Sequence, residues 1–264
     1  RQGCIWIATE LGLNRFDGCN FTTYKSNNTG LSSDALNVLL YDETENLLWI
    51  SGKFKGICAL DCSTYRFRSY GEAEGANIDN VVHLSHAANE GIWITMHHGD
   101  IVYYDKRSQT FTSLSDKGIK SLNTSNWCTF DDGTENLYIG HAQGGMSIVN
   151  LKDKSIRNFR YEAGNPKSLP GNSVYSIYKD HLENIWVGTN RGLGLFNPRT
   201  EEFTVFRHEY KFRIGALVEQ EVGDAFLAAG ADLKVHRGQL AVQVAFNRLL
   251  VDVSRGQSAV LHLT

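Results

Sequence analysis

An all-β fold built from repeated four-stranded blades, a β-propeller, is predicted by two features of this 264-residue sequence. The first is a short apolar strand centred on an aromatic residue, which recurs with separations of 43, 44, 45 and 48 residues at Trp6, Trp49, Trp93, Tyr138 and Trp186. A period in the forties around a Trp-centred strand is typical of propeller blades. The second is that Gly, Asn, Asp and Ser clusters divide each complete unit into four short strand patterns.

The strand patterns place four strands in each complete unit, and the first unit begins at its second strand. The predicted strands cover residues 34–41, 47–51, 56–60 and 65–70; 80–86, 91–96, 101–105 and 110–114; 122–130, 136–141, 146–150 and 155–161; and 172–178, 185–189, 193–197 and 202–206. Because stacked blades cover both faces of such small sheets, we interpret the five aromatic residues as structural anchors between blades. Five recognisable repeats leave open whether the ring has six or seven blades or is incomplete.

The composition changes after the last repeat. Residues 211–264 contain no Trp, Tyr, Cys or Pro, but they still alternate between apolar and polar residues, as in 239–246 and 250–253. We therefore predict propeller repeats over 1–210 and an antiparallel β meander over 211–264. That tail is either a degenerate blade, with Phe226 in the anchor place, or a segment foreign to the repeat.

Composition also bears on partners and on location. With a net charge of −3 there is no electrostatic reason to expect nucleic acid or a membrane surface as a partner. No run of 18 apolar residues is present, so no membrane span is predicted. The chain starts inside a repeat strand and without a secretion signal, so we expect it to be a piece of a longer protein. For Cys58 and Cys62, four residues apart, free thiols are favoured and a local disulfide is the alternative.

The repeat resembles the two-component regulator propeller repeat. The motif is clearest in Leu169-Pro170-Gly171-Asn172-Ser173-Val174-Tyr175-Ser176-Ile177, followed by Asp180, Asn184-Ile185-Trp186-Val187-Gly188-Thr189 and Gly192-Leu193. Leu31 to Asn37 with Leu48-Trp49-Ile50, and Trp6 to Asp17, match the same pattern. The resemblance covers roughly residues 3–206.

That resemblance implies a periplasmic sensor region of a hybrid two-component system, associated with control of polysaccharide-utilisation genes. In the family, two seven-bladed propellers precede an immunoglobulin-like domain, a membrane helix and a histidine kinase. The implied partners are therefore an oligosaccharide or other small ligand and a neighbouring propeller or immunoglobulin-like domain of the same protein. A homodimer of this chain is also expected. The fragment itself is expected not to be an enzyme, whereas the full-length protein would be a histidine kinase.

Ligand contacts are predicted in the loop between the second and third strands of each blade, because this loop opens on the same face as the connections between blades. The polar residues there could hydrogen-bond sugar hydroxyls or a carboxylate, although ordinary solvated loops are the alternative. These candidates are Glu10, Lys53, Lys55, His97, His98, His141, Gln143, Asn190 and Arg191. Trp127, outside the anchor register, is either a packing residue or a sugar-stacking platform.

Catalytic and cofactor signals are weak. His97 and His98 are adjacent, and adjacent side chains of an extended strand point to opposite sides, so no metal site is predicted. The sequence has no phosphate loop followed by a helix and no nucleophile elbow, and no cofactor is expected. Two alternatives to a sensor remain open. One is a propeller lyase or glycosidase using Glu10 with His97 or His141, and the other is a protein-binding scaffold.

Overall fold

The computed structural model describes residues 4–119 and 125–206 in full and, beyond them, the strand backbone of 213–220, 224–230, 242–245, 248–251 and 261–262. The chain divides into two compact units. One contains Arg1–Leu84 with Lys234–Thr264, and the other contains Ser85–Leu233. Within the described part of the chain, no helix is long and apolar enough to cross a membrane.

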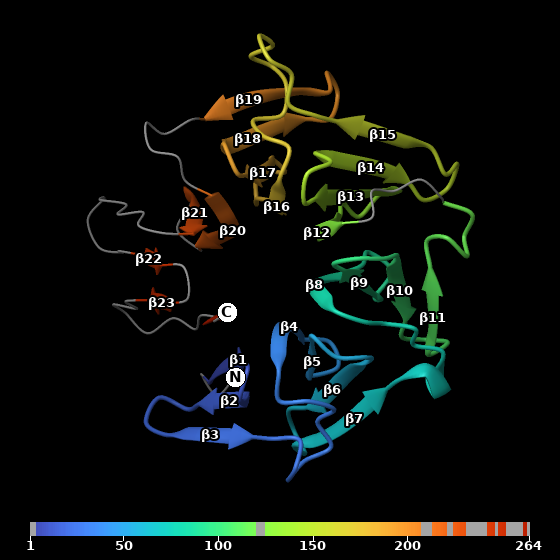
Figure 1. Cartoon of the computed structure of the whole chain (residues 1–264), viewed down its shortest axis with the longest axis vertical. Coiled ribbons are helices and arrows are strands. Elements are labelled where there is room, and N and C mark those ends of the chain that lie inside the picture. The colour runs from blue at the N-terminus through green and yellow to red at the C-terminus, as the bar shows by residue number, and fades with distance from the viewer. Residues whose placement is uncertain are drawn as a thin grey trace. The chain divides into compact units, whose positions relative to one another are not determined.

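The four complete repeats form four-stranded antiparallel sheets, with the strands side by side in chain order (Figure 1). The sheets consist of β4 (Leu36–Asp42), β5 (Leu47–Gly52), β6 (Ile57–Asp61) and β7 (Arg66–Tyr70); β8 (Val81–His86), β9 (Ile92–Met96), β10 (Ile101–Asp105) and β11 (Thr110–Ser113); β12 (Asn126–Asp131), β13 (Asn136–His141), β14 (Met146–Asn150) and β15 (Ile156–Phe159); and β16 (Val174–Lys179), β17 (Ile185–Thr189), β18 (Gly192–Asn197) and β19 (Glu202–Phe206). A 3-10 helix, η1 (Glu72–Glu74), follows β7. The predicted blades are thus confirmed; residues 122–124 of one predicted strand lie outside the described residues.

The first repeat contains β1 (Ile5–Thr9), β2 (Gly12–Phe16) and β3 (Phe21–Tyr24). Its missing edge is filled from the other end of the chain, because β24 (Leu261–His262) lies beside β1, with Ile7 opposite Leu261 and Ala8 opposite His262. This pair is parallel, whereas every pair inside the complete blades whose register is described is antiparallel.

The tail contains two antiparallel hairpins. β20 (Arg213–Gln220) pairs with β21 (Asp224–Gly230), where Phe226 lies opposite Val218, and β22 (Val242–Ala245) pairs with β23 (Arg248–Val251). Antiparallel strands were predicted here from the alternating pattern. That 211–264 is either a degenerate blade or a foreign segment stays a prediction.

The aromatic residues of the second strands lie in the cores of their units. Trp49, Trp93 and Tyr138 are at most 2% exposed and Trp6 is 8% exposed, whereas Trp186 is half-buried. Tyr138 packs with Ile148, Ile185 and Phe196, which belong to three different strands of two blades. Burying a large aromatic side chain contributes about 2–3 kcal/mol, so these positions tie neighbouring sheets together.

Glycines at the start of the third strand connect one blade to the next. The Gly12 N–H donates to Asp34 O at 2.9 Å, Gly56 to Ile78 O at 2.9 Å and Gly145 to Asn172 O at 2.8 Å. All three adopt left-handed φ angles, of 120°, 92° and 80°, which residues with a Cβ rarely adopt. The repeated bond therefore needs glycine at this place.

Gly145→Ala is expected to destabilise the protein by about 2 kcal/mol or more, because a left-handed φ costs about 1–2 kcal/mol and the new methyl group would strike the Phe159 carbonyl. Gly133→Ala is the matched control: its φ of 81° is the same, but its Cβ would meet nothing within 4 Å. Urea unfolding of the two variants measures the difference, and equal losses would contradict the packing argument.

All five cysteines are free thiols. Cys58 is buried on β6, with its Sγ 3.0 Å from Ser32 Oγ and 3.1 Å from Ser69 Oγ. Residues four apart in extended chain lie about 13 Å apart, well beyond the roughly 7 Å limit for a disulfide. The disulfide alternative for Cys58 and Cys62 is therefore wrong. Burial raises the pKa of the Cys62 thiol to about 11.

Candidate functional site

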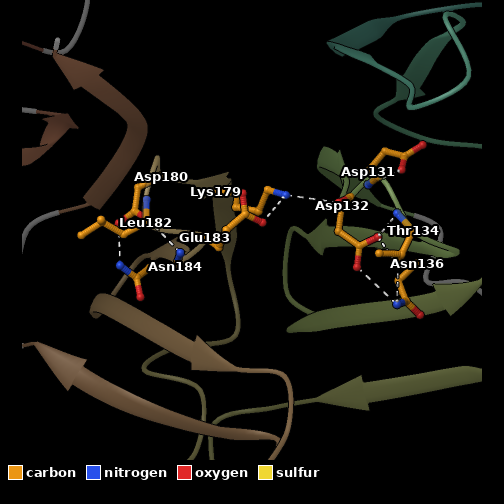
Figure 2. A network of polar contacts seen from close by, with 10 residues as sticks. Asp131, Asp132, Thr134, Asn136, Lys179, Asp180, Leu182, Glu183 and Asn184 are labelled. Carbon is orange, nitrogen blue, oxygen red and sulfur yellow. Dashed lines mark hydrogen bonds and ion pairs between the residues drawn. The ribbon is translucent and has the colours of Figure 1, made fainter.

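The turns between first and second strands have a structural role. Figure 2 shows the polar contacts of the β12–β13 and β16–β17 turns, which Lys179 links by donating to Asp132 O at 3.3 Å while it pairs with Glu183 Oε2 at 2.7 Å. In the β12–β13 turn, the Asp132 carboxylate accepts hydrogen bonds from Thr134 and Asn136. These oxygens are engaged by the turn itself, so the turn offers no ligand site of its own.

Three of the predicted ligand residues lie in the compact unit that contains Arg1–Leu84. Glu10 and Lys53 form an ion pair, with Lys53 Nζ 3.5 Å from Glu10 Oε1. Lys55 Nζ lies 3.7 Å from Glu72 Oε1. All four side chains are at least 67% exposed, and exposed pairs of this kind contribute about 0–1 kcal/mol. These residues are chemically accessible to a ligand, but their charges are already partly compensated.

The compact unit Ser85–Leu233 brings three of the predicted residues together with Tyr175, which was not predicted as a ligand contact. The ring centroids of His97 and His98 are 4.1 Å apart, those of His97 and Trp127 are 4.7 Å apart, and those of Trp127 and Tyr175 are 6.0 Å apart. We call these four side chains the aromatic row. His98 is exposed and the other three are half-buried, so the row is reachable from solvent.

The two histidine rings lie against each other, which corrects the expectation that they point to opposite sides. That expectation assumed extended backbone, but β9 ends at Met96, and both histidines belong to the loop that follows it. The His97 main-chain O accepts a bond from Asn126 N at 3.0 Å, and His98 Nδ1 lies 3.2 Å from Ser125 Oγ. The entry to β12 therefore holds this loop in place.

Bulges place Trp127 and Tyr175 in the row. In β12, Asn126 faces His141 and Cys128 faces Gly140, so Trp127 is the extra residue. In β16 the same shift leaves Tyr175 as the extra residue, and in β4 it leaves Asn37. A bulge bends its strand and redirects the side chain. Trp127 and Tyr175 also stand at the same distance before Tyr138 and Trp186, a signal in the repeat that could have identified Tyr175.

His141 is not a surface residue. It is 1% exposed, with Nδ1 at 2.9 Å from Asn126 Oδ1 and Nε2 at 2.7 Å from Ser147 Oγ, and Ser147 in turn bonds Asn158. As the last residue of β13 it lies inside the unit, not in the loop beyond. Its prediction as a ligand contact is not supported by this burial. Through Asn126, which also donates to Gly99 O at 3.3 Å, His141 instead supports the loop that carries the histidines of the row.

Burial, aided by the charge of Arg160, lowers the pKa of His141 to about 4. A histidine free in the unfolded chain titrates near 6.5, so below that pH the unfolded state binds a proton that the folded state does not. We expect stability to fall as the pH drops from about 6.5 to about 4, by at most about 3 kcal/mol. Chemical unfolding across this range tests it: His141→Gln should show a flatter profile, and an identical slope in both proteins would contradict the assignment.

The remaining predicted residues lie elsewhere in the second unit. The Asn190 N–H donates to Ser173 O at 3.0 Å, and its Oδ1 accepts from Ser173 N at 3.3 Å. The Arg191 guanidinium lies 4.8 Å from the centroid of the Tyr161 ring. Gln143 is exposed in the β13–β14 loop. These contacts leave the Arg191 and Gln143 side chains in reach of solvent, whereas the Asn190 side chain supports its own loop.

The row has the chemistry of a carbohydrate or small-ligand site. Aromatic rings present flat apolar faces, and the imidazole nitrogens and the phenol can exchange hydrogen bonds with hydroxyl groups. Among the described residues there is no group of three or more His, Cys, Asp or Glu side chains placed to hold a metal ion.

Comparisons with known proteins agree with this architecture. Residues 168–191 match the family model described as two component regulator propeller. The structure is similar to one described as the extracellular domain of the hybrid two component system BT3049 from B. thetaiotaomicron, at 28% identity and a TM-score of 0.75, over 99% of this chain and 35% of that one. Residues 168–191 of this chain therefore match the two-component regulator propeller repeat.

Two further structures support the fold alone. The extracellular domain of the hybrid two component system BT4673 from B. thetaiotaomicron matches at 21% identity and a TM-score of 0.66, over 86% of this chain and 31% of that one. The β-propeller domain of Cps50 (Swd1) from Myceliophteria thermophila matches at 10% identity and a TM-score of 0.57, over 84% and 74%. The chain thus spans about a third of the length of each extracellular domain that it resembles.

Proposed function

We propose that this chain is part of the periplasmic sensor region of a two-component signalling protein and that it binds a carbohydrate at the aromatic row. The match of residues 168–191 to the family model and the similarity to the extracellular domain of the hybrid two-component system BT3049 support the sensor class. The proposal of a carbohydrate ligand rests on one observation, the partly exposed row of rings from His98 through His97 and Trp127 to Tyr175.

The geometry of the row favours recognition of a ring-shaped, hydroxylated ligand. Trp127 and Tyr175 belong to strands of adjacent sheets, and His97 is held by Asn126, so the four rings are positioned before any ligand arrives. Preorganised aromatic side chains lose little conformational entropy on binding. A pyranose can place its C–H face on Trp127 while its hydroxyls bond to the histidines or to the Tyr175 phenol.

Signalling requires that the ligand bind two states of the protein with different affinity. A kinase outside this chain would read that difference, through a neighbouring propeller or immunoglobulin-like domain or through a homodimer. A propeller lyase or glycosidase and a protein-binding scaffold are the competing functions. They predict, respectively, turnover of the sugar and no sugar binding at all.

Calorimetric titration with a panel of oligosaccharides, with product followed by chromatography, tests the proposal. We expect binding without turnover. Trp127→Leu keeps an apolar side chain but removes the flat ring, and it should weaken binding about tenfold or more, which is roughly 1.4 kcal/mol, whereas Trp127→Phe should retain most of the affinity. Phe21→Leu is the control, because Phe21 is 64% exposed on β3, in the other unit. Sugar turnover, silence with every sugar, or wild-type affinity in Trp127→Leu would contradict the proposal.

A further inference from the structure

The first unit contains a groove that none of the predicted ligand residues lines. It lies between β3, the chain that follows β3, and the start of β7, and it has a volume of about 580 Å³. Its lining includes Thr23, Tyr24, Asn28, Tyr65, Arg66 and Phe67. We call it the Tyr65 groove. Small-molecule sites typically measure about 300–1,000 Å³, and combine aromatic walls with a few polar groups, as this groove does.

Tyr65 occupies a backbone position that does not favour it. Its φ is 57°, and its N–H closes the turn before the fourth strand by donating to Asp61 O at 2.8 Å. The corresponding turns of the other complete blades have the same left-handed conformation at Gln109, Lys154 and Glu201, all exposed polar residues. A left-handed bulky side chain is uncommon and costs energy. The turn therefore does not explain why an aromatic residue stands here.

The Tyr65 ring is part of a preformed aromatic wall. It lies parallel to the Tyr24 ring, with centroids 6.2 Å apart and planes within 5°, and the Arg15 guanidinium lies 5.3 Å from its centroid. Tyr24 packs in turn against Trp6 at 5.8 Å and Phe67 at 5.9 Å. Although Tyr65 is 39% exposed, these contacts hold its ring in one orientation.

Polar groups beside this wall remain open to a ligand. Asn28 Oδ1 accepts from Lys25 N at 3.0 Å and Thr23 Oγ1 donates to Asn14 Oδ1 at 2.7 Å. Asn28 Nδ2 and the Arg66 guanidinium make no hydrogen bond to another described residue. No carboxylate belongs to the lining. An amide and a guanidinium next to flat rings suit the ring oxygens and hydroxyls of a sugar.

We propose that the Tyr65 groove is a second saccharide-binding subsite, in which a sugar ring lies against Tyr65 and bonds Asn28 and Arg66. The inference uses only residues of the first unit, so it stands independently of binding at the aromatic row.

The second subsite is tested with a substitution at Tyr65 that copies the residue found at the same turn of another blade. Tyr65→Gln places at this turn the residue type found at Gln109, so the protein is expected to fold with little change in its melting temperature. Titrations with neutral and uronic-acid oligosaccharides are made on the Trp127→Leu protein, where the row is impaired. We expect residual binding that weakens about tenfold or more when Tyr65→Gln is added and severalfold when Arg66→Gln is added.

A control separates the two proposals. In the otherwise wild-type protein, Tyr65→Gln should leave the Trp127-dependent binding within about twofold. Absence of saccharide binding to the Trp127→Leu protein, or the same affinity with and without Tyr65→Gln in that background, would overturn the second subsite without affecting the first.

Discussion

Replacing Trp93 by Ala is expected to lower the free energy of unfolding by about 3–5 kcal/mol, because it leaves a large cavity in the core. Trp93 is 2% exposed and its ring lies 5.0 Å from that of Tyr103. Its Nε1 donates to Asp131 Oδ2 at 2.9 Å, a bond that joins β9 to the next blade. Lys117 lies 4.6 Å from the Tyr103 ring and covers the same cluster. Urea unfolding followed by circular dichroism measures the loss.

Two other variants grade the loss. Trp93→Phe keeps a six-membered ring but removes the donor to Asp131 and part of the indole volume, so it should cost less than Trp93→Ala, about 1–3 kcal/mol. Trp186→Ala should cost less than Trp93→Ala, since Trp186 is half-buried and less apolar surface is lost. A Trp93→Ala protein as stable as the wild type would show that the aromatic repeat does not hold the blades together.

Replacing Asp180 by Ala is expected to cost about 2–4 kcal/mol, because buried donors lose their acceptor. Asp180 is 5% exposed. Its carboxylate accepts from Leu182 N at 2.9 Å, from Asn184 N at 2.8 Å and Nδ2 at 2.9 Å, and from Trp186 Nε1 at 2.8 Å. One side chain therefore closes the β16–β17 turn (Figure 2). By accepting from Trp186, it also orients the anchor of that blade.

The dependence of the unfolding free energy on pH, at acidic pH, is a second test of the role of Asp180. Burial alone raises the pKa of this carboxyl, but the hydrogen bonds from Trp186, Asn184 and Leu182 outweigh it and hold the pKa below its ordinary value. A carboxyl whose pKa is lower in the folded than in the unfolded protein stabilises the fold above the unfolded-state pKa of about 3.9. This contribution to stability disappears as the pH falls through the folded-state pKa. Asp180→Ala should therefore flatten the loss of stability below about pH 4.

The matched control for Asp180→Ala is Asp153→Ala, in an exposed turn where the carboxylate accepts from Ser155 N at 2.8 Å. Much of that bond is replaced by water, so we expect a much smaller loss of stability. Equal losses in the two variants would mean that the Asp180 network contributes no more than an ordinary surface turn.

The strands could be predicted closely because both of their signals are local. Aromatic anchors and turn residues recur with the blade, and each predicted strand whose ends are described begins and ends within two residues of the observed one. The β24–β1 pair could not be predicted, because it joins segments far apart in the sequence and depends on tertiary contacts. The same holds for the groove beside Tyr65, which two different blades form together.

Part of the aromatic row, the candidate site, could be predicted from the sequence, and the reasons differ from residue to residue. His97, His98 and Trp127 were identified because they depart from the repeat, and the structure brings them together. His141 was expected in a loop but lies at the buried end of β13. Blade strands are buried on both faces, so an alternating apolar–polar pattern does not distinguish a loop residue from a core residue at a strand end. Tyr175 was overlooked although it stands at the same distance before its anchor as Trp127 does, and only the bulge that redirects it toward Trp127 could not be read from the sequence.

The anchor residues of the repeat hold the blades together, and residues outside the anchor register bind the ligand. Oligosaccharide titration of Trp127→Leu and Trp93→Phe, each combined with a thermal melt, tests it most directly. The account predicts that Trp127→Leu loses about tenfold or more in affinity with a nearly unchanged melting temperature, whereas Trp93→Phe melts lower and binds normally. Wild-type affinity in Trp127→Leu, or loss of binding in a folded Trp93→Phe, would contradict it.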